Sequence, residues 1–283
     1  MINVFFCEQE NRWIPSTRKK IGANTKFYKH AVKTFAELFQ ETLDLLKINF
    51  DCCDKQCSYS FVLQHPENVI ANYIKEPKLF LIDIFYLNDT SIKTFSHPLD
   101  TLSIQGFENV SFPKIYNGIF DDIGYYENYT NLQPPIFMGL IFRDKSDARI
   151  RLKMRNKNYE DKRSFRGNNS DLLYRYIELK QIRKLKLYLK TFPDTCHLFD
   201  NFKTLYELAV DTIFSFYFLY FVTKEITSLP HHQFHLKKTL FNLHRVYKIT
   251  KLPITKDYVY VFLLSLSNQV QYKIMKEFLL KGF

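Results

Sequence analysis

The alternation of apolar and polar residues predicts strands in the first half of the chain. Ile2–Phe6 and Arg12–Thr17 flank a polar turn, a pattern typical of a β-hairpin. Between Ala31 and Ile48 the apolar residues recur at helical spacing, so we expect an amphipathic helix packed on a sheet. Three further segments have the pattern of strands: Tyr59–Leu63, Leu79–Tyr86 and Ile136–Arg143.

A strand of a different kind is predicted at Arg149–Arg155. Its sequence, Arg-Ile-Arg-Leu-Lys-Met-Arg, places four cations on one face and three apolar side chains on the other. A strand that buries its apolar face and displays four charges is suited to bind phosphate, although a solvated sheet face has the same pattern. It begins a basic tract, Arg149 to Lys190, which holds fourteen of the forty Lys and Arg residues against four acids.

Helical spacing replaces strand alternation after residue 168. Asp171–Leu189 carries one apolar stripe along a basic helix, and plausible N-caps stand at Ser170 or Asp171, Thr204 and Thr255. The predicted fold class is α+β, with an antiparallel-sheet core in residues 1–167 and a small all-α domain in residues 168–283. The other predicted helices are Phe202–Thr227, Phe234–Thr250, Thr255–Ser267 and Val270–Leu280.

The composition of the chain indicates the charge of its partner and the compartment in which it works. The net charge of +11 and the sequence pI near 9.2 favour a polyanionic partner such as nucleic acid or a nucleotide. Five cysteines, an odd number, suit free thiols in a reducing compartment, and the spacing of Cys52, Cys53 and Cys57 does not match a zinc site. The apolar run Ile213–Val222 is ten residues long, which predicts a buried helix, no membrane partner and an intracellular, cytoplasmic protein.

Three segments in a fixed order carry a resemblance to a known family. Tyr59–Ile70 is an apolar strand, a Pro-x-Asn turn and an apolar pair, and it is followed by Phe137–Arg143 and Lys153–Tyr159. Together they resemble the third, fourth and fifth motifs of the covalent nucleotidyltransferases, in the RNA-ligase branch found in large DNA viruses. Arg12–Arg18 is similar to the strand after that family's nucleophile motif, and Phe165–Leu179 is similar to the linker and helical tail of viral members.

The resemblance implies a lysine that attacks the α-phosphate of ATP or GTP, with Mg²⁺, and passes the nucleotide to RNA. The family places that lysine in a Lys-x-Asp/Glu-Gly motif, which this sequence lacks and whose expected place is at or before Met1. Ser60 stands where the family has a ribose-binding carboxylate. Met138 stands where it has a metal-binding Glu, and a thioether is a poor substitute for a hard oxygen ligand. We therefore expect a degenerate or N-terminally incomplete member, encoded by a virus and without autonomous ligase activity or a catalytic residue.

The cationic end of the family pattern is retained. Lys153 and Arg155 match the two basic residues that neutralise the triphosphate in the family, so they are the expected nucleotide-binding pair. The alternative hypothesis is a non-catalytic RNA- or protein-binding module that uses the basic tract and the helical tail. The cations expected to contact RNA are Arg149, Arg151, Lys157, Arg163 and Arg166.

Two polar residues receive structural rather than catalytic interpretations. Asp83 lies in an apolar strand, where a buried carboxylate needs a partner, so it is interpreted as a hydrogen-bond node in preference to a residue of the nucleotide pocket. His65 lies near the turn that follows Tyr59–Leu63 and is interpreted as a structural histidine.

Overall fold

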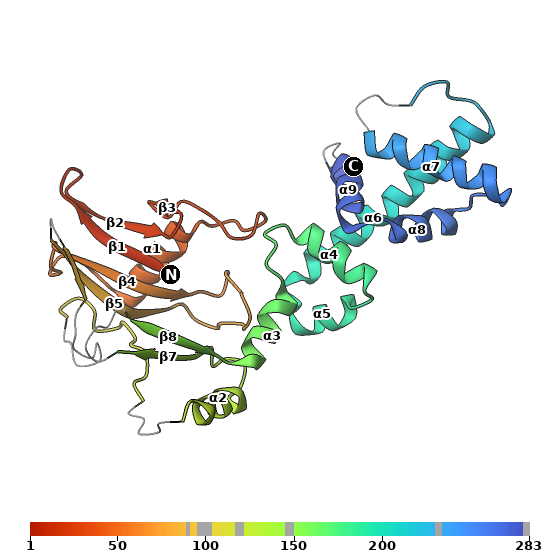
Figure 1. Ribbon diagram of the computed structural model, residues 1–283. Coiled ribbons are helices and arrows are strands. Elements are labelled where there is room, and N and C mark those ends of the chain that lie inside the picture. Colours follow the sequence, from red (N-terminus) through yellow and green to blue (C-terminus); the bar gives the residue numbers. More distant parts are fainter. Residues whose placement is uncertain (89–90, 95–103, 117–121, 145–149, 230–233, 280–283) are drawn as a thin grey trace. The chain divides into compact units, whose positions relative to one another are not determined.

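A computed structural model describes residues 1–283 except 89–90, 95–103, 117–121, 145–149, 230–233 and 280–283 (Figure 1). Antiparallel sheets and helices are both present, so the fold class is α+β, as predicted. The chain divides into two compact units, residues 1–168 and 169–283. This division falls one residue from the boundary expected from the change in sequence pattern.

The N-terminal unit is built on a six-stranded antiparallel sheet with the order β3-β2-β1-β4-β5-β6 (Figure 1). The predicted hairpin is present as β1 and β2, in which Val4 lies opposite Pro15. The strands are β1 Ile2–Cys7, β2 Arg12–Thr17, β3 Lys20–Ile21, β4 Cys57–Gln64, β5 Lys78–Asn88 and β6 Ser91–Thr94.

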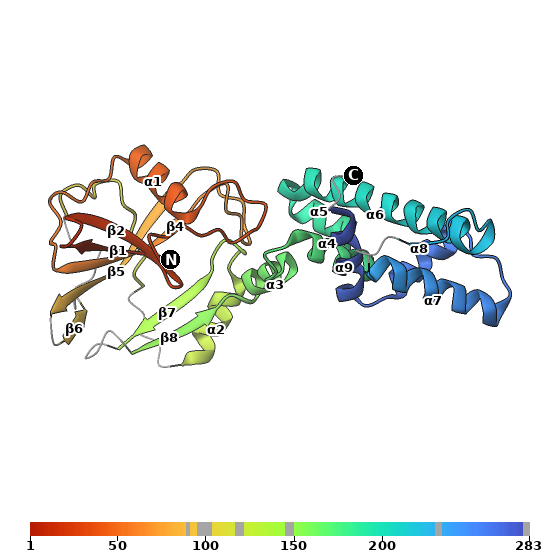
Figure 2. The ribbon, with the colours of Figure 1, turned by 90° about the horizontal axis from the view of Figure 1, so that it is seen from above.

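One helix, α1 (Phe35–Leu46), lies against the sheet (Figure 2), and its Phe39 and Leu43 belong to the core cluster between them. It begins four residues later than predicted because Thr34 forms a capping box with Glu37, so that each side chain accepts a hydrogen bond from the other residue's backbone N–H. It ends at Lys47, whose φ of 53° is in the left-handed region.

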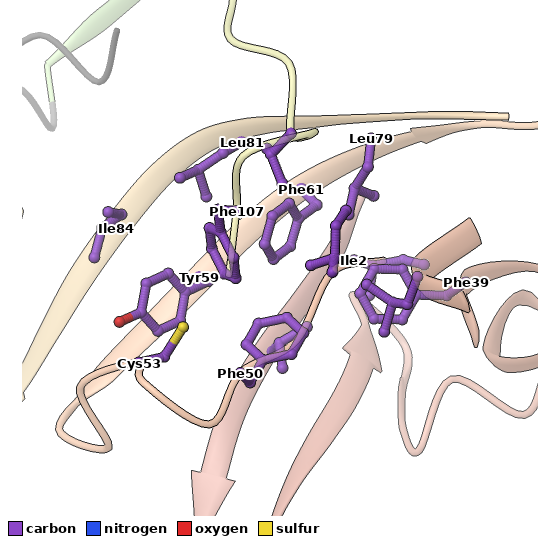
Figure 3. Packing of buried hydrophobic residues seen from close by; sticks show 14 of the residues in the cluster. Ile2, Phe39, Phe50, Cys53, Tyr59, Phe61, Leu79, Leu81, Ile84 and Phe107 are labelled. Carbon is purple, nitrogen blue, oxygen red and sulfur yellow. The ribbon is translucent and has the colours of Figure 1, made fainter. Parts of the chain in front are cut away.

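The core beneath this sheet is strongly aromatic (Figure 3). Phe61 is fully buried, and its ring lies 5.8 Å from that of Phe107 and 6.1 Å from that of Phe50 in edge-on geometry. Trp13, the only tryptophan in the chain, packs against the rings of Phe50 and Tyr59 at its margin. These residues come from β2, β4 and two loops, so the aromatic cluster ties together segments far apart in sequence.

A separate two-stranded ribbon completes the N-terminal unit. Strands β7 (Gly139–Arg143) and β8 (Arg151–Arg155) pair antiparallel, with Ile141 opposite Lys153. Two helices accompany the ribbon, α2 (Ile123–Leu132) before it and α3 (Lys157–Arg166) directly after it (Figure 1).

All the regular secondary structure described in the C-terminal unit is helical. The single helix predicted for Asp171–Leu189 is wrong: it is two helices, because the chain turns at Arg183, whose φ is 57°. The predicted caps Asp171 and Thr255 are confirmed, whereas Thr204 lies inside a helix and donates its hydroxyl to Asp200 O. The elements are α4 Leu172–Gln181, α5 Leu185–Thr191, η2 Pro193–Thr195, α6 Cys196–Tyr217, the π-helix η3 Phe218–Val222, α7 Phe234–Thr250, α8 Lys256–Ser265 and α9 Asn268–Leu279.

The apolar run near residue 213 belongs to a longer helical stretch than the sequence suggested. Residues 193–222 are helical throughout, and by length and composition this stretch could cross a membrane. The prediction of a buried helix is correct for Ile213 and Tyr217 and wrong for η3, which contains no buried residue.

Candidate phosphate-binding ribbon

The basic strand is the second strand of the ribbon, and Arg151, Lys153 and Arg155 share one face of it. Arg149 lies outside the described residues. The pairing register places Arg143 opposite Arg151, so this fourth cation projects from the same face. The ribbon therefore has a basic face made by both of its strands.

Two of these cations are directed at the six-stranded sheet. Arg143 Nη1 lies 2.8 Å from Asp83 Oδ1, and Arg151 Nη1 lies 2.7 Å from Asp83 Oδ2. Arg143 also donates from Nη2 to the carbonyl oxygen of Ile82 at 2.8 Å. Asp83 is buried, and two guanidinium groups satisfy its carboxylate in the manner that burial of a charge requires. Asp83 is the structural node that its place in an apolar strand indicated.

A β-bulge places this carboxylate. The β4–β5 register shifts between Ser60 and Phe61, so that Asp83 lies opposite Ser60 while Leu81 lies opposite Phe61. Ile82 is thus the extra residue on β5, and its carbonyl is the one that Arg143 binds. Bulges re-aim a side chain locally, and this one lets Asp83 point away from the core that Leu81 faces.

Lys153 is the cation between the two arginines of β8. Alternation along the strand places it on the same face as Arg151, the face that reaches β5. Its side chain is exposed, and it forms no ion pair with any residue that the structure describes. The strand does not bury its apolar face as predicted: Leu152 is 52% exposed, although α2 lies against β8 and the ring of Tyr126 in α2 packs on Phe142 of β7.

The outer end of the ribbon carries an acid among its cations. Glu160 of α3 forms ion pairs with Arg155 and with Arg163, the latter at 3.4 Å. Lys157 begins α3 with an exposed side chain, and its backbone N–H donates to Asn131 Oδ1 at 2.9 Å. Arg155, Lys157 and Arg163 therefore remain at the surface, with one carboxylate shared by the two arginines.

Arg166 does not belong to this surface, and its predicted contact with RNA is wrong. The residue is 3% exposed, its Nε donates to the Tyr28 hydroxyl at 3.3 Å, and its guanidinium lies 5.4 Å from the centre of that ring. These contacts join the last turn of α3 to a loop 138 positions earlier. Arg166 is a packing residue of the N-terminal unit.

Asn156 is a buried residue that the sequence reading missed. Its side-chain amide donates to the backbone oxygens of Gln133, Pro134 and Phe137, and its Oδ1 accepts from Asn158 N. One side chain thus caps α3 and fixes the segment that leads into β7. The available signal was its type and place: Asn directly before a helix is a favoured N-cap.

The two positions at which the family pattern is broken have different surroundings. Ser60 is buried, and its hydroxyl donates to Asn3 Oδ1 at 2.7 Å. Ser60 lies opposite Asp83 in the pairing of β4 with β5. Met138 is 46% exposed, and its carbonyl oxygen accepts from Asn156 N. Neither side chain brings a carboxylate to the ribbon.

The second half of the basic tract lies in the C-terminal unit and is partly occupied by internal contacts. Lys180 Nζ lies 4.3 Å from the ring centre of Tyr206, 5.0 Å from that of Tyr260 and 5.7 Å from that of Tyr176. Arg175 pairs with Glu178 at 2.9 Å. The tract of residues 149–190 is therefore divided between two units, and in each of them some of its cations form internal contacts.

Burial shifts the pKa of a histidine and two cysteines in the N-terminal unit. It lowers the pKa of His65, against the opposing effect of Glu41 and Glu67; the His65 Nδ1 accepts from Glu67 N, and its Nε2 has no hydrogen-bond partner among the described residues. Burial raises the pKa of Cys53 to about 12 and that of Cys57 to about 11. No group of three or more His, Cys, Asp or Glu side chains arranged to hold a metal ion occurs in the part of the chain that the structure describes.

No protein-family model matches this chain, and no curated protein matches it significantly. The resemblance to RNA ligases rests on the ordered segments of the sequence alone.

Proposed function

We propose that the basic face of the ribbon binds phosphate groups of RNA or of a nucleotide, and that the chain is a remnant of an RNA ligase-like nucleotidyltransferase. The observation that carries this proposal is the position of Lys153. It lies between Arg151 and Arg155 on one face of β8 and pairs with no acid in the described part of the chain. An unpaired ammonium among guanidinium groups favours a multiply charged anion.

The charge of the ribbon supports the same proposal. The four cations of the ribbon and Arg163 of α3 lie close together, and they outnumber the carboxylates with which they pair: Arg143 and Arg151 share Asp83, and Arg155 and Arg163 share Glu160. Phosphate binding would offset this mutual repulsion, because the nearby carboxylates are already shared between arginines. The five cations are Arg143, Arg151, Lys153, Arg155 and Arg163.

The proposed activity stops at binding. The sequence contains no Lys-x-Asp-Gly or Lys-x-Glu-Gly, and Ser60 uses its hydroxyl on Asn3. If the ligand is ATP or GTP, Mg²⁺ would arrive on the phosphates, and Lys153 with Arg155 would hold the triphosphate. The ribbon would then orient a nucleotide without forming a covalent intermediate.

RNA binding tests the proposal directly. The affinity of the full chain for a fluorescent single-stranded RNA is measured over a range of salt concentrations, for the wild type, Lys153→Ala and Lys19→Ala. Lys19 is an exposed lysine at the turn between β2 and β3, so it serves as a matched control. We expect Lys153→Ala to weaken binding and to reduce the salt slope by about 0.7, the value for one contact to a single strand. Equal effects of the two substitutions, or no binding at low salt, would contradict the proposal.

A test of nucleotide binding distinguishes a nucleotidyltransferase remnant from the alternative, a non-catalytic RNA- or protein-binding module. Thermal unfolding is followed with ATP and with GTP, each with Mg²⁺, because a ligand that binds only the folded state raises the melting temperature. A shift that is lost in Lys153→Ala supports the nucleotide-binding remnant, whereas RNA binding without any shift supports the module. An acid-stable protein–nucleotide adduct would overturn the statement that the chain only binds.

A further inference from the structure

The C-terminal unit contains an apolar helix that the unit itself covers poorly. In residues 193–222, only 33% of the most apolar 18-residue window is buried. A core helix of the same composition in a water-soluble domain would have most of that window buried. The surplus apolar surface therefore has no partner within the described part of the chain.

This surface is concentrated at the end of the helical stretch. Phe218 is 45% exposed and Val222 is 55% exposed, and Ser215 continues the same stripe at helical spacing. A shallow depression of about 320 Å³ adjoins the stripe. Its lining comes entirely from α6 and η3: Asp211, Thr212, Ser215, Phe216 and Leu219.

Helix α7 extends the surface and supplies charge. It packs on η3 through Phe221, whose ring lies 5.6 Å from that of Phe241 and stacks on His244 at 4.0 Å. The last turns of α7 and the two residues that follow it carry exposed apolar and cationic side chains. These are Arg245, Tyr247, Lys248, Ile249, Lys251 and Leu252.

The charge around this surface is predominantly positive. From Phe214 to Lys256 the sequence has seven Lys and Arg residues and a single acid, Glu225. Lys256 pairs with Asp211, so the acid that lines the depression is already neutralised. Aliphatic groups such as Val222 and Ile249 offer little to a nucleic acid, whose bases stack on rings and whose phosphates bind cations. The acyl region and anionic headgroups of a bilayer match both kinds of side chain.

We propose that the surface formed by η3, the last turns of α7 and the two residues after α7 binds peripherally to an anionic membrane. The exposed apolar side chains, Phe218, Val222, Tyr247, Ile249 and Leu252, enter the headgroup and upper acyl region. Arg245, Lys248 and Lys251 bind lipid phosphates or carboxylates beside them. The ribbon of the N-terminal unit takes no part in this contact, so the inference stands independently of the proposed phosphate binding.

Vesicle flotation with the full chain tests this inference. Vesicles of pure phosphatidylcholine are compared with an equal mixture of phosphatidylcholine and phosphatidylserine. We expect binding to the mixed vesicles, little binding to the neutral ones, and release at high salt. Equal recovery on both vesicle types, or no recovery on either, would overturn the proposal.

Paired substitutions then locate the contact. Arg245→Glu with Lys248→Glu should weaken binding by about thirtyfold or more, since each cation near the membrane surface strengthens binding about fivefold. Phe218→Ser with Val222→Ser should weaken it as well. Ile21→Ser with Leu132→Ser removes even more exposed apolar groups from the N-terminal unit and should change nothing.

Two outcomes separate a specific membrane contact from nonspecific adsorption and from nucleic-acid binding. All the substituted residues are exposed, so circular dichroism should show unchanged helix content and validate each comparison. If the control pair lost as much binding as the η3 pair, the membrane contact would be nonspecific and the proposal wrong. If the Arg245–Lys248 pair abolished RNA binding but left flotation unchanged, the surface would be assigned to nucleic acid instead.

Discussion

Arg151 donates from Nη1 to Oδ2 of Asp83 across 2.7 Å and 68 positions of sequence, and this contact attaches the ribbon to the sheet. Arg143 reaches the other oxygen of the same carboxylate. The two guanidinium groups are partly exposed, whereas the carboxylate is buried. The carboxylate therefore needs the arginines to compensate its charge, while the arginines can also be hydrated by solvent.

Replacement of Asp83 by Asn should separate stability from binding. We expect the free energy of unfolding of the N-terminal unit to fall by about 1–2 kcal/mol, because charge-assisted hydrogen bonds are weakened while the partly exposed guanidinium groups can be hydrated by solvent. RNA affinity should rise, because the same two cations become available to phosphate. Urea unfolding followed by the fluorescence of Trp13, together with the RNA titration, checks both changes. Glu76→Gln removes an exposed acid from the same unit and is the control for net charge.

Asn156→Ala should destabilise the N-terminal unit by about 3 kcal/mol, because three backbone carbonyls lose a buried donor. Asn158→Ala, two residues further on, removes exposed hydrogen bonds and should cost less than about 1 kcal/mol. Urea unfolding of both variants measures the difference. Equal losses would show that the segment before β7 is held mainly by other contacts.

The stability of the N-terminal unit should fall as the pH drops below about 6.5, the ordinary pKa of histidine. Burial lowers the pKa of His65 in the folded protein, so as the pH falls the histidine of the unfolded chain is protonated before that of the folded chain. The unfolded state is therefore favoured increasingly as the pH falls toward the pKa of His65 in the folded state. The groups that face the imidazole are Glu41 at 3.8 Å, Glu67 and Lys33.

Unfolding measured by Trp13 fluorescence at a series of pH values isolates this unit from the C-terminal one, in which burial also lowers the pKa of His244. His65→Gln should flatten the pH dependence. An unchanged slope in this variant would assign the effect to other groups.

Thiol labelling should distinguish the three neighbouring cysteines. Cys52 is exposed, whereas Cys53 and Cys57 are buried with a raised pKa, and the thiolate is the form that reacts. We expect Cys52 to react with a disulfide reagent in the folded protein, and Cys53 and Cys57 only after unfolding. Cys52→Ser should remove a fast phase. Loss of a slow phase instead would mean that Cys52 is shielded.

Local sequence signals predicted the strands and helices well where the pattern was continuous. Helix α7 has the predicted bounds, and the β1–β2 hairpin follows from apolar runs on each side of a polar turn. The break between α4 and α5 was missed because neither Gly nor Pro marks it: Arg183 adopts a positive φ in a basic helical sequence.

The candidate site was less predictable because its contacts are long-range. The alternation in β8 correctly placed Arg151, Lys153 and Arg155 on one face, but nothing in the strand reveals that Arg151 is paired with Asp83. Arg166 was assigned to the surface because a cation is usually solvated, and only the folded chain brings Tyr28 to it. The spacing of residues predicts which face of a strand a side chain occupies. Which of the charged side chains form ion pairs depends on residues that are distant in the sequence.

Within the residues that the structure describes, the ribbon has two strands and no third strand pairs with either edge, and such a unit is marginally stable by itself. Its attachments among the described residues include the ion pairs with Asp83, the hydrogen bond from Arg143 to Ile82, the Asn156 node and contacts with α2. The amide protons of β7 and β8 should consequently exchange with solvent through a local opening that leaves β1, β4 and β5 protected. Since a bound phosphate would hold the ribbon closed, hydrogen exchange at these few amides would report occupancy of the ribbon for any ligand, including one that has not yet been identified.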